Sequence, residues 1–254
     1  MDKSGYIAVF DSGVGGLSVL RHLRRLMPGE SYIYYGDCAN APYGSRTTDE
    51  VRTLTLAAAQ KLVAEYSVKA LVVACNTATA AAIRQLRAAY PNLIVIGIEP
   101  ALKLAADTFP GGRIGVMATE VTLREEKFDT LMHRFDAGCT VTKIPAPGLV
   151  ELIEDGNVDG QRMDDLLRQL LSPYIGQLDA LVLGCTHYPF AAAAISCVLG
   201  PQVRLLDGGE GTAKETKRRL QAADLLQAEG EGQLLLTASG DQTRFVAVAE
   251  KLLR

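Results

Sequence analysis

Two cysteines, Cys75 and Cys185, have the sequence context of reactive thiols. Each follows a short aliphatic run typical of a buried strand, where the chain is expected to turn into the next helix. The free N–H groups at a helix N-terminus carry partial positive charge, which favours the thiolate of a cysteine placed there. We therefore expect both residues to act as acids or bases, the alternative being that they only pack as small hydrophobic residues.

A pair of opposed thiols has a specific chemical use. One thiolate removes a proton from one face of a carbon atom while the other thiol delivers a proton to the opposite face, so the centre is inverted. Negative charge then develops next to a carboxylate and must be stabilised by fixed hydrogen-bond donors. Candidates for this role are Asn76, Thr77 and Thr186, which directly follow the two cysteines.

A histidine accompanies the second cysteine. His187 stands two residues after Cys185, and it is the only one of three histidines beside a reactive candidate. We expect it to tune Cys185 or to protonate a substrate. The alternative is a buried histidine with a structural role.

A glycine-rich segment follows the first expected strand. Asp11 and Ser12 lead through it into a helix, and its glycines let the backbone approach a ligand closely. The segment lacks the spacing of a nucleotide-binding loop. We expect Asp11 to pair with a substrate ammonium group or to support Cys75, with Ser12 as its hydrogen-bonding neighbour, unless either residue only caps the helix.

Two further segments supply candidate residues. Pro42, Tyr43 and Gly44 form a turn that is expected to offer backbone N–H groups and a phenol to the site, although ordinary turns have the same composition. Glu151 lies at the start of an expected helix and is a candidate catalytic acid. In that position it also stabilises the helix dipole, whatever its other role.

An α/β architecture would position these residues. Aliphatic runs alternate with Ala- and Leu-rich stretches of helical spacing, which predicts βαβ units and parallel sheets. Expected helices include 49–66 and 163–171. The expected strands are 7–10, 32–35, 70–74, 94–98, 114–117, 140–144, 181–184, 203–206 and, in the tail, 234–239.

A faint internal repeat organises the chain. ALVVACNTATA (70–80) aligns with ALVLGCTHYPF (180–190), which pairs Cys75 with Cys185 at an offset of 110 residues. Two further matches have nearly the same offset, namely Ser12 with Thr119 at 107 and Glu99 with Asp207 at 108. Thr119 thereby joins the candidate substrate-binding residues.

The repeat predicts two similar parallel-sheet α/β domains related by a pseudo-twofold axis. The first would comprise residues 1–98 and 207–254, and the second residues 99–206. Ligands collect at the carboxyl ends of parallel strands and between domains. We therefore expect the active site in the cleft between the two domains.

Composition narrows the class of protein. The 254 residues are 48% hydrophobic and 22% charged with a net charge of -3, which is typical of a globular protein with a large core. No basic run favours nucleic acid, and no apolar stretch approaches the roughly 20 residues of a membrane span. Five scattered cysteines argue against a disulfide framework, so we expect free thiols in the cytoplasm.

Several short motifs together resemble those of one family, the glutamate racemases of the aspartate/glutamate racemase superfamily. They are DSGVGG (11–16), PYG (42–44), CNTAT (75–79), VELIE (150–154), CTHYP (185–189) and ASGDQTRF (238–245). The resemblance implies a cofactor-independent enzyme that binds no metal, in which Cys75 acts on D-glutamate and Cys185 on L-glutamate. It also implies substrate contacts by Asp11, Ser12, Tyr43, Gly44, Asn76, Thr77, Thr186 and His187.

The same resemblance implies a biological setting. The enzyme would be a cytoplasmic homodimer that supplies D-glutamate for peptidoglycan and thus for cell-wall biogenesis and cell shape. Three alternatives stay open. The first is a racemase for aspartate or another small acid, or a decarboxylase or isomerase of the same superfamily. The second is a zinc-binding module that uses Cys75, Cys185 and His187. The third is a regulatory protein that binds DNA gyrase.

Overall fold

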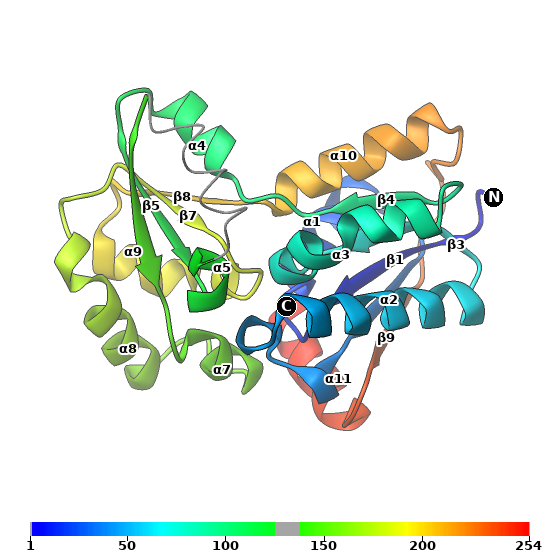
Figure 1. The fold of residues 1–254 in the computed structure, drawn as a ribbon, viewed down its shortest axis with the longest axis horizontal. Helices are drawn as coiled ribbons and strands as arrows, with labels where there is room; N and C mark the ends of the chain where they lie inside the picture. The colour runs from blue at the N-terminus through cyan, green and yellow to red at the C-terminus, as the bar shows by residue number, and fades with distance from the viewer. Residues whose placement is uncertain (1, 125–137, 254) are drawn as a thin grey trace. The chain divides into compact units, whose positions relative to one another are not determined.

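The chain folds into two compact α/β units. The computed structural model describes residues 2–124 and 138–253. One unit comprises Met1–Glu99 with Gly209–Arg254, and the other Pro100–Gly208. Each unit has its own parallel sheet with helices packed on it (Figure 1). The predicted fold class, two parallel-sheet α/β domains, is thus confirmed.

The first unit is built on a five-stranded sheet of order β4-β3-β1-β2-β9, in which every neighbouring pair is parallel. The central strands are continuous aliphatic or aromatic runs because helices cover both of their faces. One of the two edge strands, β9, comes from the tail of the chain and pairs with β2. The strands are β1 (Tyr6–Asp11), β2 (Tyr32–Gly36), β3 (Val68–Val73), β4 (Ile94–Gly97) and β9 (Leu234–Ala238).

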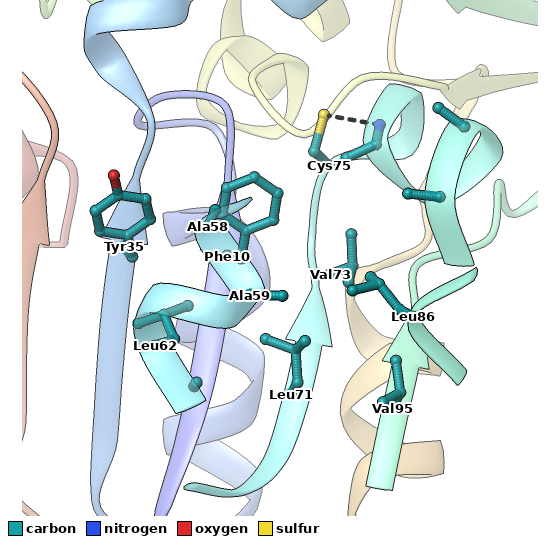
Figure 2. Packing of buried hydrophobic residues seen from close by; sticks show 14 of the residues in the cluster. Phe10, Tyr35, Ala58, Ala59, Leu62, Leu71, Val73, Cys75, Leu86 and Val95 are labelled. Carbon is teal, nitrogen blue, oxygen red and sulfur yellow. Dashed lines mark hydrogen bonds between the residues drawn. The ribbon is translucent and has the colours of Figure 1, made fainter. Parts of the chain in front are cut away.

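Helices α2 and α3 cover one face of this sheet. Figure 2 shows Leu71 and Val73 of β3 within the same buried cluster as Leu62 of α2 and Leu86 of α3. The carboxyl end of β3 leads directly to Cys75. The helices of the unit are α1 (Leu17–Leu26), α2 (Thr48–Glu65), α3 (Asn76–Ala89), α10 (Gly209–Ala222) and α11 (Gln242–Leu253), with short 3₁₀ turns η1 (Cys38–Asn40) and η2 (Tyr43–Ser45).

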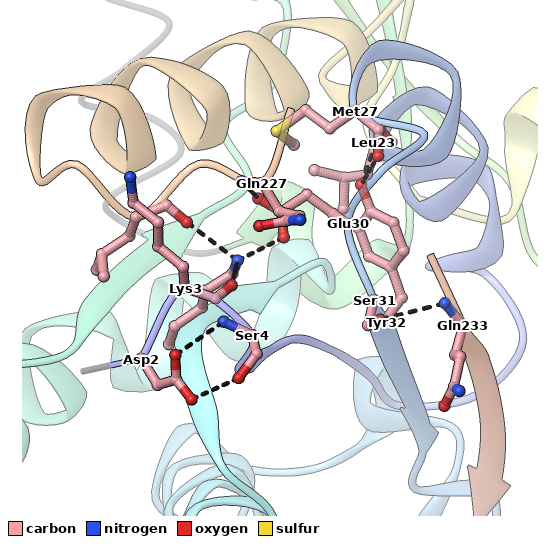
Figure 3. Close-up of polar contacts among 12 residues, drawn as sticks. Asp2, Lys3, Ser4, Leu23, Met27, Glu30, Ser31, Tyr32, Gln227 and Gln233 are labelled. Atoms are coloured by element: carbon pink, nitrogen blue, oxygen red, sulfur yellow. Dashed lines mark hydrogen bonds and ion pairs between the residues drawn. The ribbon is translucent and has the colours of Figure 1, made fainter. Parts of the chain in front are cut away.

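A buried ion pair lies at the amino end of the same sheet. Lys69 Nζ is 2.6 Å from Glu30 Oε2, and neither side chain is more than 1% exposed. The second Glu30 oxygen accepts a hydrogen bond from the backbone N–H of Gln227 at 2.8 Å (Figure 3). Lys69 also donates to the carbonyl oxygen of Leu225 at 3.0 Å. The pair therefore ties the segment after α10 to the sheet.

The second unit has a four-stranded parallel sheet of order β6-β5-β7-β8. Its core packs α7, α8 and α9 on one face, and α4 lies on the other. The strands are β5 (Arg113–Ala118), β6 (Thr140–Pro145), β7 (Ala180–Leu183) and β8 (Arg204–Asp207). The helices are α4 (Leu102–Thr108), α5 (Glu120–Arg124), α7 (Leu149–Glu154), α8 (Gln161–Leu171) and α9 (Ala192–Leu199), with 3₁₀ turns η3 (Ser172–Tyr174) and η4 (Tyr188–Ala191).

The two sheets repeat one topology. The order β4-β3-β1-β2 corresponds strand by strand to β8-β7-β5-β6. Phe10 pairs with Val73 in the first sheet, and Met117 pairs with Leu183 in the second. These pairs reproduce the offsets of 107 and 110 residues found in the sequence.

The third match of the repeat was wrong by two residues. Val73 pairs with Gly97, and its counterpart Leu183 pairs with Asp207. Asp207 therefore corresponds to Gly97 rather than to Glu99. The error arose because short aliphatic strands align almost equally well after a shift of two residues, which keeps the same side chains on each face.

The expected strands are all present, and their ends differ from the prediction by no more than two residues. The expected helices 49–66 and 163–171 correspond to α2 and α8. Within the described ranges, no helix is both long enough and apolar enough to cross a membrane.

Candidate active site

Cys75 lies at the junction between β3 and α3. It is the N-cap of α3, and its Sγ accepts a hydrogen bond from the backbone N–H of Ala78 at 3.4 Å (Figure 2). Its thiol also lies 3.7 Å from Ser12 Oγ. Cys75 is 6% exposed. The expected position at a helix N-terminus is thus confirmed for this cysteine, and it favours the thiolate.

The loop after β1 brings Ser12 to this thiol. Asp11 Oδ1 accepts a hydrogen bond from the Gly13 N–H at 2.9 Å, which closes an Asx turn. The N-cap of α1 is Gly16, so Asp11 and Ser12 are not its caps. A Cβ on Gly16 would lie 2.7 Å from the Asp11 Cβ and 2.9 Å from the Ala74 Cβ. Glycine is therefore needed where the loop packs against the residue before Cys75.

The first turn of α3 carries two predicted ligand-binding residues. Asn76 Oδ1 is buried and accepts no hydrogen bond from any residue that the structure describes. Thr77 follows it and is half-buried. A buried polar atom without a partner costs about 1–3 kcal/mol, so a ligand that donates to Asn76 would relieve this cost.

The turn at Pro42–Gly44 differs from the prediction in one respect. Tyr43 was expected to offer its phenol to the site, but it is only 1% exposed and donates its O–H to Asp37 Oδ2 at 2.6 Å. Burial, together with the hydrogen bond to Asp37 and its charge, raises the pKa of Tyr43 well above its usual value. The phenol therefore stays protonated and donates its hydrogen bond to Asp37. Turn composition alone does not indicate where such a ring points.

Cys185 occupies the equivalent place in the second unit. It follows β7 after Gly184, just as Cys75 follows β3 after Ala74. The expected helix start is different, however, because Cys185 enters a turn and then the short η4, and α9 begins only at Ala192. Its thiol lies beside an imidazole, with 3.5 Å between Cys185 Sγ and His187 Nδ1.

His187 connects this thiol to an acid. Its Nε2 lies 2.5 Å from Glu154 Oε1 at the end of α7, and the ring is buried. Burial acts to lower the pKa of His187, but the hydrogen bonds and charges of Cys185 and Glu154 outweigh it and raise the pKa well above its ordinary range. Cys185, His187 and Glu154 thus form a hydrogen-bonded chain of three groups that can bind or release a proton.

Glu154 was not among the predicted residues. The predicted acid of this helix was Glu151, which is exposed in the first turn of α7. Glu154 lies three residues later, and residues three apart share one face of a helix. That spacing places both acids on one side of α7 but does not show which of them reaches His187, so the sequence alone does not indicate Glu154. Glu151 does lie near enough to Tyr188 that its charge contributes, after burial and Cys185, to raising the pKa of that phenol.

The remaining predicted residues of the second unit lie close to strand ends. Thr186 is buried next to Cys185. Thr119 directly follows β5, and its Oγ1 accepts a hydrogen bond from the Thr122 N–H at 3.3 Å. It thus lies where the repeat placed it, as the counterpart of Ser12.

The structure therefore gathers the predicted residues into two groups. Asp11, Ser12, Cys75, Asn76 and Thr77 lie at the carboxyl end of the first sheet, while Cys185, Thr186 and His187 lie at the carboxyl end of the second. Each group offers one thiol with hydrogen-bonding neighbours. No cluster of three His, Cys, Asp or Glu residues with the geometry of a metal site occurs among the described residues.

Comparisons with known proteins match this arrangement. Residues 13–216 fit the family model of Asp/Glu/hydantoin racemases. The chain is 46% identical over 253 residues to the glutamate racemase of Clostridium acetobutylicum, covering 99% of this chain and 98% of that protein.

Solved structures show the same likeness. Glutamate racemase isoform RacE1 from Bacillus anthracis superposes with a TM-score of 0.88 at 34% identity, covering 99% of this chain and 94% of that one. The Thermus thermophilus glutamate racemase, in complex with β-chloro-D-alanine, superposes with a TM-score of 0.85 at 39% identity and the same coverage.

Proposed function

The chain belongs to the Asp/Glu racemase family as a glutamate racemase, and from that premise we propose that Cys75 and Cys185 are the two acid–base groups of its reaction. An amino-acid racemase must remove the α-proton from one face and return a proton to the other. The observation that supports the pair most strongly is the repeat, since each thiol follows the corresponding strand of the two matching sheets.

The proposed reaction needs only these thiols to carry protons. With L-glutamate, the thiolate of Cys185 takes the α-proton and becomes a thiol. The carbanion that forms takes a proton from the thiol of Cys75, which becomes a thiolate. The product is D-glutamate, and proton exchange with water restores both starting states. With D-glutamate the two cysteines exchange roles.

The unequal surroundings of the thiols suggest how each is controlled. Cys75 has the Ala78 N–H and the Ser12 hydroxyl as neighbours, so helix-end electrostatics favours its thiolate. Cys185 has the His187 imidazole, which can exchange a proton with it and is oriented by Glu154. We assign Glu154 as a positioning residue for His187.

Substrate binding follows from the groups left available. The buried Asn76 Oδ1 would accept a hydrogen bond from the α-ammonium group, which satisfies an otherwise costly atom. The amide and hydroxyl groups of Asn76, Thr77 and Thr186 would stabilise the carboxylate as charge builds on it. Because the Tyr43 phenol is bonded to Asp37, the turn at 42–44 would bind the side-chain carboxylate through its backbone N–H groups.

The proposed biological role is the supply of D-glutamate for peptidoglycan in the cytoplasm. A homodimer is the expected assembly, which light scattering after size-exclusion chromatography would test. Binding to DNA gyrase is a separate question, and a supercoiling assay with a Cys75→Ala/Cys185→Ala variant would separate it from racemisation.

Circular dichroism of glutamate tests the assignment of the thiols. Wild type, Cys75→Ala and Cys185→Ala are each incubated with D- and with L-glutamate without added cofactor. Wild type is expected to bring both solutions to zero ellipticity, and each variant to stay at the background rate. Cys197→Ala, which removes an exposed thiol, is the matched control and should behave as wild type. Full activity in either single active-site variant would reject the pair, and inactivity of wild type towards glutamate would direct the same assay to aspartate.

A further inference from the structure

We propose that Asp37 is a positioning residue that couples the substrate-binding turn at 42–44 to Ser239 in the tail of the chain. The inference rests on the proposed function, because it takes that turn to bind the side-chain carboxylate of glutamate. Through Asp37, Ser239 would control substrate affinity although it lies 202 positions from Asp37 in the sequence.

Three side chains converge on the Asp37 carboxylate. Asp37 directly follows β2 and is 4% exposed. Its Oδ2 accepts the Tyr43 O–H at 2.6 Å, and its Oδ1 accepts the Ser239 O–H, also at 2.6 Å. The Asn40 amide Nδ2 lies 3.1 Å from both oxygens. One buried carboxylate thus joins the 3₁₀ turns η1 and η2 to the tail.

Ser239 is itself held in place from both sides. Its Oγ accepts a hydrogen bond from the Ala39 N–H at 3.0 Å, and its own N–H donates to the Gly36 carbonyl oxygen at 2.9 Å. The next residue, Gly240, has φ +79°, a left-handed conformation that glycine adopts without strain. The tail therefore turns sharply beside η1, directly after β9 has paired with β2.

The Tyr43 ring transmits this constraint to the turn. It packs in the core cluster beneath α2 and α3, with its centroid 6.3 Å from that of Phe10. Packing holds the ring, and the hydrogen bond to Asp37 holds its hydroxyl end. Hydrogen bonds to an ionised carboxylate are about twice as strong as neutral ones, so their loss should loosen the turn measurably.

A looser turn should weaken glutamate binding more than it slows proton transfer. The thiols are positioned by β3 with α3 and by β7, none of which carries Asp37 or its partners. Removing a contact that is equal in the ground state and the transition state raises KM and leaves kcat unchanged. A purely structural role of Ser239 would instead lower stability without changing KM.

Steady-state kinetics with Ser239→Ala, Tyr43→Phe and the double variant tests this coupling. Each single variant is expected to raise KM for both glutamate enantiomers about 3- to 10-fold. Ser239→Ala, whose site lies in the tail and carries no substrate-binding group, should also keep kcat within about twofold of wild type. The double variant should raise KM by less than the product of the two single effects, because both act through Asp37. Ser239→Thr keeps the hydroxyl and should restore most of the affinity.

Ser31→Ala is the matched control. Ser31 Oγ accepts a hydrogen bond from the Gln233 N–H at 3.1 Å, so it also links the tail to β2, but at the opposite end of the strand (Figure 3). Ser31→Ala should lower the unfolding midpoint, as Ser239→Ala does, but should leave KM for glutamate unchanged. The inference is overturned if Ser239→Ala has the kinetics of Ser31→Ala, or if the Ser239 and Tyr43 effects simply multiply.

The cysteine variants and Ser239→Ala separate the proposed function from the Asp37 coupling. Activity remaining in Cys75→Ala or Cys185→Ala contradicts the proposed function and leaves the Ser239 coupling intact as an effect on KM. An unchanged KM in Ser239→Ala, with both cysteine variants inactive, contradicts the coupling alone.

Discussion

Lys69→Met is expected to destabilise the chain strongly while leaving its chemistry intact. Lys69 and Glu30 form an ion pair 2.6 Å long, with side chains 1% and 0% exposed. Methionine fills a similar volume but leaves the Glu30 carboxylate buried without its cation. Lys69 lies at the amino end of β3 and Cys75 beyond its carboxyl end, roughly 20 Å apart at about 3.3 Å per strand residue.

The magnitude follows from the burial of the pair. Breaking a buried ion pair by removing one partner costs about 3–5 kcal/mol, because the remaining charge is uncompensated. In a chain of this size each kcal/mol lowers the unfolding midpoint by about 2–4 °C, so a loss of about 6–20 °C is expected. The hydrogen bond from Lys69 to the Leu225 carbonyl oxygen is lost as well.

Thermal denaturation followed by circular dichroism measures the loss in midpoint, and urea denaturation measures the free energy of unfolding. The matched control is Lys3→Met, which removes the exposed pair of Lys3 with Asp224 and should leave the midpoint almost unchanged. Glu30→Gln added to Lys69→Met removes the buried charge yet keeps an acceptor for the Gln227 N–H, so the double variant should recover about 2 kcal/mol. If Lys69→Met is no less stable than Lys3→Met, or if the second change brings no recovery, the ion pair does not stabilise the fold as argued.

Two more predictions concern the second unit. Cys185 and Glu154 raise the pKa of His187 in the folded chain. This shift stabilises the fold fully below the His187 pKa of the unfolded chain, about 6.5, and the stabilisation is lost as pH rises through the folded pKa. Glu154→Gln should therefore lower the His187 pKa in an NMR titration and flatten the fall in stability above pH 6.5; an unchanged titration would show that Glu154 does not act on the ring. Tyr188→Phe should leave the unfolding free energy unchanged or raise it, because the buried hydroxyl has no hydrogen-bond partner within the described residues. Tyr32→Phe in the first unit is the comparison and should cost about 1–3 kcal/mol, since that hydroxyl shares its proton between two carbonyl oxygens. Equal losses of unfolding free energy in Tyr188→Phe and Tyr32→Phe would contradict the expected difference.

Much of the fold could be predicted because its signals are local. The strands are short aliphatic runs between glycines and polar residues, and the repeat around Cys75 and Cys185 revealed two matching sheets. The register of the last repeated strand could not be obtained in the same way. A shift of two residues preserves which side chains face the core, so Glu99 and Gly97 fit the pattern almost equally.

The candidate site was predictable to the extent that its residues follow strands. Cys75, Ser12 and Cys185 lie at strand ends, where parallel sheets bring residues from distant parts of the chain together. The partners of these groups depend on tertiary contacts instead. Glu154 reaches the turn at His187 from the end of α7, and the Tyr43 phenol turns inward to Asp37. Neither contact leaves a spacing in the sequence that distinguishes it from a solvated acid or an ordinary turn.

Incorporation of deuterium from D₂O at the α-carbon of glutamate tests the two-thiol reaction most directly. Wild type is incubated with α-protiated L-glutamate in D₂O, and the reaction is stopped at low conversion. Because the proton leaves to one thiol and the new hydron comes from the other, the D-glutamate formed should carry deuterium at the α-carbon while the remaining L-glutamate keeps its protium. D-Glutamate that retains the original proton, or equal deuterium content in both enantiomers from the start, would contradict proton transfer by two opposed groups.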